Sequence, residues 1–105
     1  MATGHELPEK AFTAEDVELA ERRVADARER AAYAGLSAAS SIEESARQHE
    51  RVASLHDRTA ERGDSHVAVH EDSASRHRQA AADDRKMAAQ KRRESEADLM
   101  LRTDG

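Results

Sequence analysis

Five histidines recur in the middle of the chain at spacings that could support chemistry on helices: His49, His56, His66, His70 and His77. His66 and His70 are four residues apart, a spacing that brings two imidazoles to one helical face within reach of one metal ion. A facing helix could add His56, so one hypothesis is a site of His56, His66 and His70 for Zn²⁺ or another transition metal. A second hypothesis is a pH response, because imidazoles gain charge between pH 5 and 8. The interpretation that we prefer is that the rings are packing groups and that no cofactor is bound.

A seven-residue repeat indicates which elements carry these histidines. One column steps by sevens from Val17 to Leu101 without insertion or deletion, and the column beside it is almost all alanine from Ala25 to Ala88. A register held over this length is typical of helices and coiled coils. The residues of the first column that we expect at a helix–helix interface are Val17, Val24, Ala31, Val52, Met87 and Leu101.

Helix boundaries can be placed from capping residues and glycines. Thr13 followed by Asp16 predicts an N-cap, and Gly63 predicts a turn after which Asp64 or Ser65 could cap a second helix. We therefore expect helices over about 13–62 and 65–101, folded as an all-α, elongated antiparallel hairpin with coiled-coil packing. Folding at Gly63 would place His56 opposite His70 and His49 opposite His77, and would bring Leu99, Met100 and Leu101 close to Val24. The alternative is a three-helix bundle with breaks near 35–40 and 63, because Gly35 precedes a second capping pattern at Ser41.

The expected organisation is a single helical domain over 13–101, between flexible segments at 1–12 and 102–105. Leu, Ile, Val and Phe make up only 13 of the 105 residues, so the core of one chain is thin. Association would supply the missing burial. The partner that we expect is the chain itself, as a homodimer or higher oligomer, or another helical protein.

Composition also argues against several classes of function. There is no cysteine, no glycine-rich phosphate loop and no recognisable catalytic arrangement of serine, histidine and acid, so we expect no enzyme activity. The net charge is -5, only Phe12 and Tyr33 are aromatic, and neither half of the chain is a basic arm, which makes nucleic-acid binding an unfavoured interpretation. No apolar run could span a membrane, and we expect a cytoplasmic protein. The predicted function is that of a structural or interaction protein, with the histidine-lined metal-binding or pH-responsive bundle as the alternative.

Overall fold

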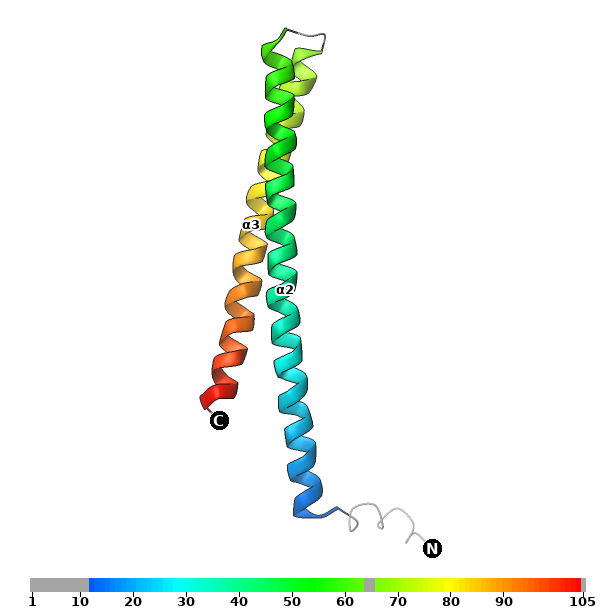
Figure 1. Ribbon diagram of the computed structural model, residues 1–105, viewed down its shortest axis with the longest axis vertical. Coiled ribbons are helices and arrows are strands. Elements are labelled where there is room, and N and C mark those ends of the chain that lie inside the picture. The colour runs from blue at the N-terminus through cyan, green and yellow to red at the C-terminus, as the bar shows by residue number, and fades with distance from the viewer. Residues whose placement is uncertain (1–11, 64–65, 105) are drawn as a thin grey trace, which may run out of the picture.

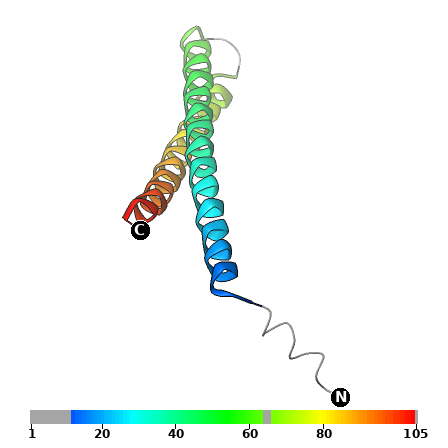
Figure 2. The same ribbon diagram turned by 60° about the horizontal axis from the view of Figure 1, so that its bottom comes forward.

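Two long helices make up the fold. The computed structural model describes residues 12–63 and 66–104, in which α2 spans Ala14–Glu61 and α3 spans Val67–Asp104, with no strand in these ranges. Figures 1 and 2 show the two helices lying side by side and running in opposite directions. The 48 residues of α2 correspond to a rod of about 72 Å at 1.5 Å per residue. The predicted antiparallel hairpin is confirmed.

The first helix begins at the predicted cap. The Thr13 hydroxyl accepts a hydrogen bond from the Asp16 backbone N–H (3.1 Å), and the Asp16 carboxylate accepts one from the Thr13 N–H (3.0 Å). This capping box satisfies backbone donors that a helix leaves free at its N-terminus. Glu15 and Asp16 also place negative charge where the helix dipole is positive. The local sequence therefore fixes the start of α2.

The predicted alternative of a break at 35–40 is wrong, because α2 continues through Gly35 and Ser41 without interruption. Gly35 has another role. A Cβ atom at this position would lie 2.1 Å from the Ser95 Oγ and 3.3 Å from the Ser95 Cβ of α3. The missing side chain thus makes room for the opposing helix.

The end of α2 is set by Gly63. Its backbone is left-handed, with φ of 73°, and its N–H donates to the Ala60 carbonyl at 3.0 Å. This is the usual termination of a helix by glycine, and it confirms the predicted turn at Gly63. The predicted caps Asp64 and Ser65, like most of the segment 1–12, lie outside the described residues.

The start and end of α3 differ slightly from expectation. His66, which precedes the helix, is a non-glycine residue with φ of 70°, and its carbonyl accepts a hydrogen bond from the His70 N–H at 3.0 Å. At the other end the helix continues to Asp104, beyond the expected end at Leu101.

The core of the hairpin is a column of alanines spaced seven residues apart on both helices. Each is at most 2% exposed, and Ser95, the next member of the column on α3, is 6% exposed. Small side chains let the two backbones approach closely, which valine or methionine at these positions would prevent. The alanines of the column are Ala32, Ala39, Ala46 and Ala53 of α2 and Ala74, Ala81 and Ala88 of α3.

The column that runs from Val17 to Leu101 is not the buried one. Val52 is half-buried, Ala31 is exposed, and Met87 is 52% exposed, because the seam between the helices lies one residue further along the sequence. Next to the exposed Met87 on α3, Ala88 of the alanine column is buried instead. These side chains of the first column remain available to contacts outside the hairpin.

The end of the hairpin opposite the turn is open. None of residues 12–31 is buried, and both views show α3 diverging from α2 toward its C-terminus (Figures 1 and 2). Val24 is 53% exposed, Met100 67% and Leu101 71%, so Val24 is not covered by Met100 and Leu101 to the extent expected, whereas Leu99 is half-buried. We call the apolar residues Phe12, Val17, Leu19, Val24, Met100 and Leu101, all exposed, the open end.

Candidate functional site

Four of the histidines meet in pairs across the helix interface. A hydrogen bond of 2.8 Å joins the Nδ1 atoms of His49 and His77, and one of 2.9 Å joins those of His56 and His70. In each pair the ring centroids are 5.1 Å apart. Both pairs predicted from the turn at Gly63 are therefore confirmed. They follow from the heptad register, since each helix contributes one histidine every seven residues to the same side of the alanine column.

The two pairs are in contact with one another. The rings of His56 and His77 are nearly parallel, at 17°, with centroids 6.0 Å apart. The four rings thus form a continuous row in the order His70, His56, His77, His49, which we call the histidine ladder. All four side chains are half-buried.

A carboxylate closes one end of the histidine ladder. The Asp84 Oδ2 lies 3.9 Å from the His49 Nε2, and this oxygen is buried with no hydrogen-bond partner. A buried carboxylate oxygen without a donor is costly. A proton on His49 would place a positive charge beside it. Near the other pair, Asp57 interacts electrostatically with His56 and is hydrogen-bonded by Arg78.

The hydrogen bonds of the histidine ladder limit how many protons it can hold. A bond between two Nδ1 atoms needs an N–H on one ring and a lone pair on the other. One extra proton per pair leaves that bond intact, because it can occupy the Nε2 of the donor ring. A second proton would make both Nδ1 atoms donors and break the bond. The geometry therefore couples the contact between α2 and α3 to the protonation of the rings.

The predicted metal site of His56, His66 and His70 does not come together. His56 contacts His70, whereas His66 is exposed and lies before α3 in the left-handed backbone region. The spacing of four residues between His66 and His70 therefore does not place both rings on one helical face. Within residues 12–63 and 66–104, no group of three or more histidine or acidic side chains is arranged to hold a metal ion.

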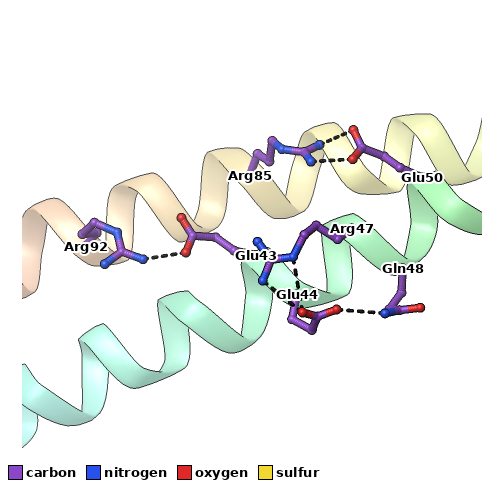
Figure 3. Close-up of polar contacts among 7 residues, drawn as sticks. All are labelled: Glu43, Glu44, Arg47, Gln48, Glu50, Arg85 and Arg92. Atoms are coloured by element: carbon purple, nitrogen blue, oxygen red, sulfur yellow. Dashed lines mark hydrogen bonds and ion pairs between the residues drawn. The ribbon is translucent and has the colours of Figure 1, made fainter.

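A second column of polar contacts flanks the alanine column, and the sequence analysis did not identify it. Arg78, Arg85 and Arg92 of α3, spaced by sevens, each donate to a carboxylate of α2. Figure 3 shows the bidentate pair of Arg85 with Glu50, at 2.7 and 2.6 Å, and the pair of Arg92 with Glu43 at 2.6 Å. Arg78 donates a single hydrogen bond to Asp57. The missed signal was the matching period of the acids and the arginines.

These ion pairs perturb the carboxylates of α2. The hydrogen bonds from Arg85 lower the pKa of Glu50, and the hydrogen bond from Arg78 lowers the pKa of Asp57. The pKa of Glu44 is also lowered, but by Gln48 and Arg47 of its own helix (Figure 3). Only the first two shifts therefore report on the pairing of α2 with α3.

The open end carries shallow apolar grooves along the first turns of α2. The residues that line them are Phe12, Asp16, Val17, Leu19, Ala20, Glu21, Arg23, Val24, Ala25 and Arg28. The apolar members recur at helical spacing and α3 does not cover them. Among the interface residues predicted from the sequence, Val17 and Val24 lie in these grooves, and Leu101 lies on the diverging arm of α3.

Comparisons with known proteins give no relative: no family model, curated protein or solved structure matches the chain. Of the described helices, neither combines the length and the apolar character needed to cross a membrane.

Proposed function

We propose that this chain is a non-enzymatic interaction protein that associates with a second copy of itself through the open end. The observation that supports the proposal is the contrast along α2. Val52, in the same heptad column as Val17 and Val24, is half-buried where α2 packs on α3, whereas Val17 and Val24 are about half exposed in the part of α2 where no residue is buried. Apolar residues gathered on both arms of an open helical pair favour burial by a partner.

Charge favours a second copy as that partner. Residues 12–21 contain four acidic side chains and no basic one, whereas α3 carries Lys91 and Arg93 near its end, on either side of Arg92, which pairs with Glu43 of its own chain. In a two-fold dimer, the acidic first turns of one α2 would lie beside the basic stretch of the partner's α3, and the reciprocal contact would form at the same time. The apolar residues of the two open ends would then cover each other.

The test is the mass in solution of the double variant Val17→Asp and Val24→Asp, measured by sedimentation equilibrium. We expect the parent to exceed its chain mass of 11.6 kDa and the double variant to have a smaller mass than the parent, with its helicity retained. Leu55→Asp is the matched control, because Leu55 is also about half exposed but lies near the turn. Equal masses for the parent and the double variant would contradict the proposal.

A second candidate function is a pH-responsive hairpin, which the two Nδ1-to-Nδ1 hydrogen bonds favour. Lowering the pH from 7.5 to 5.5 is the perturbation that tests this function, because a second proton on a pair would break its hydrogen bond. Circular dichroism should show a loss of stability in the parent that is smaller in His56→Gln with His70→Gln. His66→Gln is the control, since His66 lies outside the histidine ladder. The same acid response in all three proteins would contradict this function.

A further inference from the structure

The heptad phase is conserved across the turn. The alanine column passes from Ala46 and Ala53 through Ala60 and Val67, both half-buried, to Ala74 in constant steps of seven. A hairpin does not require this constant spacing, because the connection between two antiparallel helices can have any length that closes the turn. A single continuous helix with one uninterrupted apolar face does require it.

The contacts between the helices have a matching symmetry. Each step of seven forward along α3 corresponds to a step of seven backward along α2, for the histidine pairs and for the ion pairs alike. These contacts depend only on the antiparallel register. The α3 of a second copy can therefore replace the chain's own α3, residue for residue, if each chain forms one long helix.

The backbone beside the turn favours such a change. Gly63 and His66 both have left-handed φ angles, of 73° and 70°. Glycine adopts this region freely, but the Cβ of a histidine is sterically disfavoured there. A continuous helix would return His66 to the right-handed region and relieve this conflict.

We propose that two copies of the chain exchange α3 helices and form an elongated antiparallel dimer of continuous helices, in which every contact between α2 and α3 is made between chains. The partner is a second copy, because this chain itself supplies the alanine column, the histidines and the arginines in the order that the contacts require. Like-charged neighbours oppose the parallel arrangement, in which Glu43, Glu50 and Asp57 would lie opposite themselves. The exchange uses the turn and not the open end, so it goes beyond the association proposed above and can fail or succeed independently.

Cross-linking across one ion pair tests the exchange, and the absence of cysteine from the chain makes it practical. In the variant Asp57→Cys with Arg78→Cys, a short bismaleimide reagent would join the two positions within one chain in the hairpin and between chains in the exchanged dimer. Denaturing electrophoresis separates the two products by mass. We expect a two-chain product whose fraction rises with protein concentration.

Hinge variants make the test directional. Gly63→Ala with His66→Ala should favour the continuous helix and raise the two-chain fraction several-fold, whereas His66→Gly should lower it. Circular dichroism of each variant confirms that the helices are formed. A single-chain product alone, both in the cysteine variant and after the alanine changes, would overturn the proposal.

The same reagent separates this proposal from association through the open end. With Val17→Asp and Val24→Asp added, the two-chain product should persist if the exchange occurs. A decrease in mass together with a single-chain product alone would overturn the exchange and support the open end. A two-chain product, together with a mass unchanged by Val17→Asp and Val24→Asp, would support the exchange and contradict association through the open end.

Discussion

Replacing Gly35 by alanine tests whether the two helices approach as closely as the alanine column implies. Glycine inside a helix usually costs about 0.5–1 kcal/mol relative to alanine, so Gly35→Ala would stabilise an isolated helix by that amount. In the hairpin the new Cβ would lie 2.1 Å from the Ser95 Oγ and 3.3 Å from the Ser95 Cβ. The hydroxyl must rotate away and the backbones must separate slightly.

Whether Gly35→Ala stabilises or destabilises the protein depends on the balance between the gain in helix propensity and the cost of overpacking. Overpacking of a closely packed contact typically costs about 1–3 kcal/mol, which exceeds the gain in helix propensity. We therefore expect Gly35→Ala to destabilise the protein by about 0.5–2 kcal/mol. In the background of Ser95→Ala the 2.1 Å contact is absent and the nearest atoms are the Cβ of residue 95 at 3.3 Å and the Lys91 Cγ at 3.9 Å, so the same change should be neutral or stabilising. The coupling between the two positions should reach about 1 kcal/mol, as for residues in direct contact.

Thermal and urea unfolding followed by circular dichroism, at one fixed protein concentration, measures this cycle. Each kcal/mol corresponds to a change in Tm of roughly 4–8 °C for a domain of about this size. Comparing Ser37→Gly with Ser37→Ala, at an exposed position of the same helix, gives the propensity difference without the contact. Stabilisation by Gly35→Ala in both backgrounds, with no coupling to Ser95, would refute the close approach of the helices.

Two further predictions concern the ion pairs. Glu50→Arg should place like charges opposite Arg85 and lower the Tm by a few degrees, and adding Arg85→Glu should restore the Tm. The difference in Tm between the single and double variants should be smaller at high salt. Equal Tm values for the two variants would contradict the pairing. Acid should also weaken the hairpin, because the pKa values of Glu50 and Asp57 are lower in the folded state than their ordinary values of 4.5 and 3.8. The stabilisation from these pairs is complete above the ordinary pKa values and is lost as the pH falls through the lower pKa values of the folded state. Urea midpoints between pH 6 and 3 should therefore decline less in the variant lacking Arg78 and Arg85, and an equal decline would contradict this assignment.

The course of the chain was predictable because local signals agreed with one another. The capping box of Thr13 with Asp16, the glycine at position 63 and the unbroken heptad each restrict the helices independently, and together they give the hairpin. The histidine pairs followed from the same register, since an antiparallel fold at Gly63 leaves little freedom in which residues face each other.

Two features were not predictable from the same patterns. The first is that the alanine column, and not the column from Val17 to Leu101, forms the seam. Periodicity alone does not show this, because small side chains are preferred only where two backbones come close. Gly35 was ambiguous for the same reason, as a glycine can end a helix or make room for a neighbour. Its role depends on Ser95, which is 60 positions away in the sequence.

The uniform heptad contacts have a consequence for alignment. Sliding α3 by seven residues along α2 would place alanine on alanine again, return Arg85 to a carboxylate at Glu43 or Asp57, and keep one of the two histidine pairs. The packing thus permits a series of alternative registers of α3 on α2 that differ by seven residues, or about 10 Å. The turn at Gly63 and the close approach of Gly35 to Ser95 select one of these registers. Where the turn is released, the length of the assembled rod would change only in whole steps.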